Sequence, residues 1–152
     1  MQKDDTHLNR FYFWVNYLKA ISLFFAFLGA LWAIIGSFDP FGLYDRAFAQ
    51  AFWNVDRLPA DAQKTFSFIL GPFGATNAGY FILQFFIAKH AYSNRQMWGY
   101  KAIVVAFLVW LILDTSMCLV HKGYFNILFA NIPSLLAMLP IFFTRRYFTD
   151  RS

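Results

Sequence analysis

Four apolar runs, each long enough to cross a lipid bilayer as a helix, dominate the chain. They cover approximately residues 17–38, 66–88, 98–119 and 124–143. A helix rises about 1.5 Å per residue, so about 20 residues cross the ~30 Å hydrocarbon layer. Backbone groups inside lipid must hydrogen-bond within their own segment, which favours helices. The runs therefore predict an all-α membrane protein, a single domain of four transmembrane helices in an up-down bundle over residues 1–152.

The balance of apolar and charged residues supports lipid as the solvent of this chain. Hydrophobic residues make up 59% of the sequence and charged residues only 14%, against about 25% charged in soluble domains. Such a chain cannot cover a surface that faces water, so its expected partners are membrane lipids. The net charge of +5 is explained by the cytoplasmic bias of Lys and Arg and by anionic headgroups. We therefore expect no nucleic-acid partner.

The segment between the first two runs is expected to form a short amphipathic helix. Asp39 precedes Pro40, and a proline disfavours the helical conformation in the residue before it, so the first helix should end there. Over residues 41–55, apolar side chains recur on one face at helical spacing, opposite Arg46 and Gln50. This pattern predicts an interfacial helix lying in the plane of the membrane surface. The alternative is a lid that covers the mouth of the bundle.

The distribution of Lys and Arg predicts the orientation of the chain. Nine of the 13 lie in the N-terminal tail and its aromatic collar, in the link between the second and third runs or in the C-terminal segment, with Lys19 counted in the collar and Lys101 in the link; four lie on the opposite side. Because cytoplasmic loops are enriched in Lys and Arg, both termini should be cytoplasmic. The expected location is the inner (plasma) membrane of a bacterium.

Polar residues inside the apolar runs are the candidate functional residues. A carboxylate near the centre of a membrane helix costs about 2.5 to 3.5 kcal/mol on insertion scales, so Asp114 in the third run suggests a functional site. Asp114 shares one helical face with Trp110, Cys118 and His121, at spacings of four, four and three residues. Asn131 and Asn77 lie in the fourth and second runs. With both termini cytoplasmic, these residues form a polar layer toward the outer leaflet.

The combination of an apolar bundle with a few convergent polar groups is typical of a ligand site. The leading interpretation is a protein that binds a hydrophobic small molecule or a lipid in an outer-leaflet pocket with a polar head site. Asp114 and Asn131 would bind the polar head of the ligand, and Asn77 and His121 would contribute further contacts to it. Trp110, together with Phe side chains, would hold the apolar body.

Three alternatives remain open on the sequence alone. Asp114 can be structural, hydrogen-bonded to Asn77 or Asn131 across the bundle. The chain can be an accessory subunit of a larger membrane complex or a homo-oligomer, because the small residues Gly71, Ala75 and Gly79 let a neighbouring helix approach closely. It can also be an enzyme of the proton-transfer type, such as a double-bond isomerase that uses Asp114 as acid or base. Whether the protein is an enzyme is left undecided.

Several other chemistries have no matching motif in the sequence. Cys118 is the only cysteine, which excludes an intrachain disulfide and a cysteine-based metal site. No pair of His residues within the runs has the spacing of haem or metal ligands, and no glycine-rich phosphate loop is present. We therefore expect neither a cofactor nor a metal.

Overall fold

The computed structural model describes residues 2–36, 39 and 41–148, and within these ranges it contains helices and no strand. Four helical segments are long and apolar enough to cross a membrane: Leu8–Ile35, Ala60–Tyr92, Met97–Val120 and Tyr124–Tyr147. The prediction of an all-α chain with four apolar helices that could cross a membrane is confirmed.

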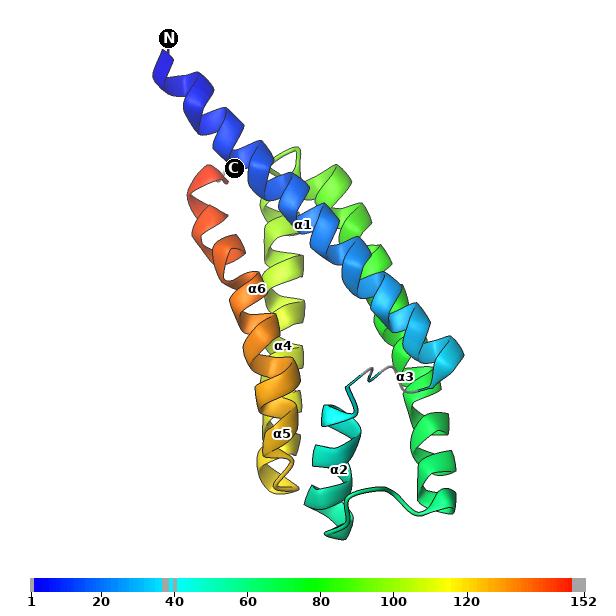
Figure 1. Cartoon of the computed structure of the whole chain (residues 1–152). Coiled ribbons are helices and arrows are strands. Elements are labelled where there is room, and N and C mark those ends of the chain that lie inside the picture. The colour runs from blue at the N-terminus through cyan, green and yellow to red at the C-terminus, as the bar shows by residue number, and fades with distance from the viewer. Residues whose placement is uncertain (1, 37–38, 40, 149–152) are drawn as a thin grey trace.

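The helices follow one another along the chain with short connections (Figure 1). The first half of the chain contains α1 (Gln2–Ile35), α2 (Leu43–Trp53), α3 (Ala60–Ile87) and the π-helical turn η1 (Ala88–Tyr92). The second half contains α4 (Met97–Val120), α5 (Tyr124–Asn126), the π-helical turn η2 (Ile127–Asn131), α6 (Ile132–Phe142) and the 3-10 turn η3 (Phe143–Tyr147). The first two spanning helices begin earlier than the apolar runs because their first turns are polar, and hydropathy does not detect polar turns.

Helices α1 and α3 form a close pair along most of their lengths (Figure 1). Gly29 and Gly74 make this possible: a Cβ atom built on Gly74 would lie 2.5 Å from the carbonyl oxygen of Gly29 and 2.6 Å from the amide nitrogen of Ala33. The sequence drew attention to Gly71, Ala75 and Gly79 instead. Ala75 and Gly79 are exposed, and a Cβ on Gly79 would meet nothing within 4 Å.

The main hydrophobic core lies toward the end of the molecule that carries both termini and η1 (Figure 1). All four spanning segments contribute to it, with these buried members: Phe11, Val15, Leu18, Ala88, Tyr92, Tyr100, Ile103, Phe107, Met138, Ile141 and Phe148. Buried polar groups here are paired. The Tyr92 hydroxyl donates to Thr144 Oγ1 at 2.7 Å, and Gln84 Nε2 donates to Ser22 Oγ at 3.0 Å. This end of the bundle is therefore the closely packed one.

At the opposite end, α2 lies between α3 and α5 (Figure 1). The ring of Phe48 lies 4.2 Å from that of Phe66 in α3 and 5.8 Å from that of Phe125, measured between centroids. Tyr44 places its ring 5.2 Å from Phe125. In Figure 1, α2 runs in the same general direction as α5 and the adjoining end of α4. Aromatic side chains of a short helix thus join the α1–α3 pair to the second half of the chain.

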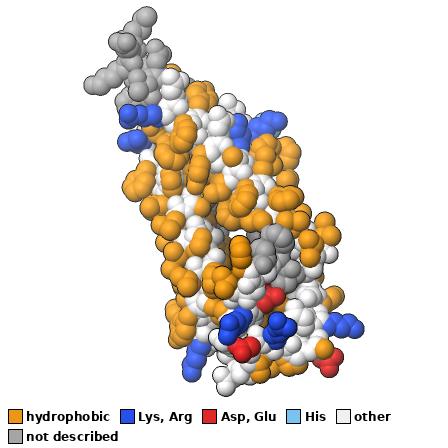
Figure 2. Space-filling model, viewed as in Figure 1, with side chains coloured by type: hydrophobic (Ala, Val, Ile, Leu, Met, Phe, Trp, Pro, Cys, Tyr) orange, Lys and Arg blue, Asp and Glu red, His pale blue; other side chains and the backbone are white. Residues whose placement is uncertain are grey.

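Charged side chains lie toward the ends of the molecule. On the face shown in Figure 2, hydrophobic side chains cover the middle, while Lys, Arg and Asp side chains lie near the two ends. At the end that contains α2, Arg46 and Asp56 form an exposed ion pair of 3.0 Å, and Gln50 donates to the same carboxylate oxygen. These hydrogen bonds and the charge of Arg46 lower the pKa of Asp56. This distribution is the one that a membrane-spanning protein requires.

Candidate functional site

Asp114 lies on the side of α4 that faces the rest of the protein. Buried Phe107 and Cys118 mark that side, and Asp114 falls between them at helical spacing. Its Oδ2 atom accepts a hydrogen bond from Asn126 Nδ2 at 2.8 Å, and the Cys118 thiol lies 3.7 Å from the same oxygen. Asn126 Nδ2 also lies 3.2 Å from Cys118 Sγ. The carboxylate therefore has partners on its own helix and on the next one.

The tight turn after α4 is what brings Asn126 back beside Asp114. Lys122 adopts a left-handed conformation with φ of +57°, and the Gly123 amide donates to the Cys118 carbonyl at 2.8 Å. This hydrogen bond closes the end of α4 in the manner of a helix C-cap. The chain reverses within this short turn, and α5 begins at Tyr124.

Tyr44 links α2 to the same group of side chains. Its hydroxyl donates to Asn126 Oδ1 at 3.1 Å. Burial, and then the nearby Asp114 carboxylate, raise the pKa of Tyr44 to about 12. The phenol therefore stays protonated near neutral pH and remains a hydrogen-bond donor. We refer to Tyr44, Asn126, Asp114 and Cys118 as the Asp114 network.

Asn131 forms a second polar contact beside this network. It is only 3% exposed, and its Nδ2 donates to Thr115 Oγ1 at 2.7 Å. Its Oδ1 is buried and makes no hydrogen bond within the described part of the chain. Asn131 ends the π-helical turn η2, and Pro133 follows near the start of α6. Single π-helical turns of this kind occur frequently at functional sites.

The other residues singled out in the sequence make no hydrogen bond with the network within the described residues. Asn77 is partly buried in α3 and makes no side-chain hydrogen bond to any residue that the structure describes. It follows Phe66 by 11 positions and so shares the helix face that meets α2. Trp110 is partly buried, with its ring 5.8 Å from that of Phe107. His121 is exposed at the end of α4.

Two members of the Asp114 network are not predicted by the sequence. Asn77 and Asn131 were the expected structural partners of Asp114, but the amide that reaches the carboxylate belongs to Asn126. The sequence contains one indication of this pair. Asn126 is a polar residue at the start of the fourth apolar run, and it follows Asp114 by 12 positions across a short turn. Nothing in the sequence pointed to Tyr44, which lies on the apolar face of its helix.

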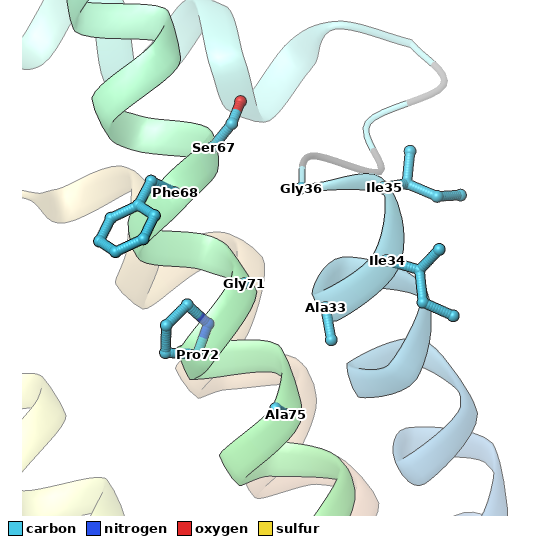
Figure 3. A pocket seen from close by; sticks show the side chains of 9 residues that line it. All are labelled: Ala33, Ile34, Ile35, Gly36, Ser67, Phe68, Gly71, Pro72 and Ala75. Carbon is cyan, nitrogen blue, oxygen red and sulfur yellow. The ribbon is translucent and has the colours of Figure 1, made fainter.

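A shallow groove lies elsewhere, between the last turn of α1 and α3 (Figure 3). Its volume is about 570 Å³, and its lining is mostly apolar: Ala33, Ile34, Ile35, Gly36, Ser67, Phe68, Gly71, Pro72 and Ala75. Such a lining can contact hydrocarbon but offers no charged group to a polar head. Among the described residues, no three His, Cys, Asp or Glu side chains are grouped as metal ligands.

Comparison of the chain with protein-family models, curated proteins and solved structures finds no match. The evidence for the candidate site is therefore its geometry alone.

Proposed function

We propose that this membrane protein binds a hydrophobic small molecule or a lipid, with the polar head of the ligand at Asp114. The observation that supports this proposal is the Asp114 network itself. Asp114 is partly exposed on the protein-facing side of α4, and only its Oδ2 atom is hydrogen-bonded within the described residues. The other carboxylate oxygen can accept a hydrogen bond from a ligand. A few polar groups in a mostly apolar surrounding are the usual character of a small-molecule site.

The apolar body of the ligand would lie between the α1–α3 pair and the second half of the chain. Trp110 and Asn77 border this region in the proposal, from α4 and α3 respectively. At this end the two halves are joined by aromatic contacts of Phe48 in α2 with Phe66 and Phe125. A ligand can enter by displacing this short helix while the core at the opposite end stays intact.

The proposed placement in the membrane is that of an up-down bundle in a bacterial inner membrane, with both termini cytoplasmic and α2 at the outer interface. The bias of Lys and Arg toward the two terminal segments supports this orientation. Asp114 then lies about 8 Å from the middle of α4, toward the outer leaflet. His121, which is exposed at the end of α4, would face the membrane interface and not the ligand.

Native mass spectrometry of the full chain, extracted in mild detergent, tests this function. We expect a bound lipid or small molecule at a fixed stoichiometry on the unmodified protein. Asn77→Phe should lower its occupancy several-fold because the larger ring would occupy the position that the proposal gives to the apolar body of the ligand. Thr76→Phe is the matched control: Thr76 is exposed on another face of α3, so occupancy should not change. A monomer without any bound molecule would overturn the proposal.

A second candidate function is that of an accessory subunit. The observation that favours it is the exposure of Ala75 and Gly79 on α3, which the α1–α3 pair leaves uncovered. Small residues at this spacing let another transmembrane helix approach closely. The same mass spectra separate the two candidates, because co-purifying larger subunits and no small ligand would favour the subunit.

A further inference from the structure

The absence of a cationic partner for Asp114 among the described residues, and its carboxylate oxygen without a hydrogen bond, indicate which head group fits. We infer that the ligand is an amphiphilic amine whose protonated head carries at least one N–H group. This inference rests on the proposed function, since it specifies the ligand of the same site. Its grounds are charge and hydrogen-bond capacity.

No cationic side chain among the described residues pairs with the Asp114 carboxylate. The ion pair between Arg46 and Asp56 is exposed and does not include Asp114. The other members of the Asp114 network, Tyr44, Asn126 and Cys118, are neutral. Two donors, the Asn126 amide and the Cys118 thiol, point at the same carboxylate oxygen, which suits an ionised acceptor. A partly buried carboxylate of this kind is stabilised by a cation.

Two hydrogen-bond acceptors in this part of the molecule have no donor within the described residues. Asp114 Oδ1 makes no hydrogen bond within the described residues, and neither does the buried Oδ1 of Asn131. Asn131 is connected to the same part of α4 through Thr115, the residue next to Asp114. A head group that supplies N–H donors can pair with Asp114 Oδ1, and one that only accepts hydrogen bonds cannot.

Charge complementarity also disfavours heads that contain phosphate. Phosphate recognition uses Arg, Lys or several backbone N–H groups, and the Asp114 network contains no Lys or Arg. Trp110 lies four residues before Asp114 on the same helix face, where its ring can face a cation. A single cationic head on a hydrocarbon chain therefore fits these groups better than a phospholipid head.

The test uses three probes with the same 12-carbon chain: dodecylamine, dodecanol and dodecanoate. We measure how much of each radiolabelled probe binds to the full chain in phosphatidylcholine nanodiscs. The amount that binds to nanodiscs without protein is subtracted. We expect saturable binding of dodecylamine, at least about tenfold tighter than that of the other two. This comparison uses the unmodified protein, so it does not depend on whether a variant folds.

Variants then test whether the amine head of the probe binds at Asp114. Asp114→Asn should weaken dodecylamine binding on the order of 10- to 100-fold, because it removes the charge while keeping the shape. Asp61→Asn, the same change at an exposed carboxylate near the start of α3, should leave it unchanged. Nanodiscs made with phosphatidylethanolamine test the exclusion of phosphate, because the head of this lipid carries both an amine and a phosphate. We expect that this lipid does not displace dodecylamine, and displacement would overturn the exclusion of phosphate-containing heads.

Failure of this inference is distinguishable from failure of the proposed function. If dodecanol or dodecanoate binds as tightly as dodecylamine, the inference of an amine head is wrong, but the proposal that the protein binds an amphiphilic ligand is retained. The same holds if mass spectrometry finds a bound molecule that lacks an amine. If no probe binds saturably and the purified protein carries no small molecule, the results contradict the proposed function.

Discussion

Substitution of Gly74 by valine is expected to separate α1 from α3 and to lower the free energy of unfolding by about 3 kcal/mol or more. The Cβ atom of any replacement would lie 2.5 Å from the Gly29 carbonyl oxygen and 2.6 Å from the Ala33 amide nitrogen. Both are backbone atoms, so no side-chain rotation relieves the contact. The helices themselves must move apart, which would also loosen neighbouring contacts such as the hydrogen bond between Gln84 and Ser22.

The matched control is Gly79→Val, in the same helix five residues later. A Cβ on Gly79 would meet nothing within 4 Å, so the added methyl groups face lipid and the unfolding free energy should change by less than about 1 kcal/mol. Unfolding is followed by circular dichroism during titration with sodium dodecyl sulfate in mixed micelles. Equal destabilisation at the two positions would contradict the close α1–α3 contact.

These two glycines also illustrate what the sequence could and could not predict about the fold. Hydropathy and length were enough to predict four apolar helices, because they reflect the cost of burying unpaired backbone groups in lipid. The helix face used for packing is a different matter. Gly71, Ala75 and Gly79 form a regular stripe, but α3 approaches α1 most closely at Gly74, which lies beside Gly29. Both faces of α3 contain small residues, so only the position of the partner helix distinguishes them.

The candidate site was predictable to a similar extent. Asp114 stood out because a carboxylate in an apolar helix is costly, and its helical phase placed it with Cys118. Its partner Asn126 depends on the geometry of the turn at Lys122 and Gly123. The position of Asn131 depends on the π-helical turn η2, whose extra residue per turn changes the helical phase of the residues after it. Neither feature has a reliable signal in a single sequence.

The contact that joins α2 to the rest of the protein suggests the second large effect. Phe48→Ala is expected to release α2, because the Phe48 ring lies 4.2 Å from that of Phe66 and 5.8 Å from that of Phe125. Loss of a buried Phe side chain costs about 3–5 kcal/mol. Phe48 is only partly buried, so we expect about 2 kcal/mol, or roughly 30-fold less protection of the α2 amides in hydrogen exchange. The hydrogen bond from Tyr44 to Asn126 should be lost with it.

Phe41→Ala is the matched control for this prediction. Phe41 lies two residues before α2 and is 83% exposed, so its loss removes no ring contact with α3 or α5. The pair separates two ways of holding α2 in place. If protein contacts hold it, only Phe48→Ala reduces the protection of residues 43–53. If insertion of aromatic side chains into the lipid interface holds it, the two variants reduce protection to a similar degree, because each removes one apolar ring from the membrane. The second result would mean that lipid, and not the Phe48 contacts, holds α2 in place, so a ligand would not have to break those contacts to reach Asp114.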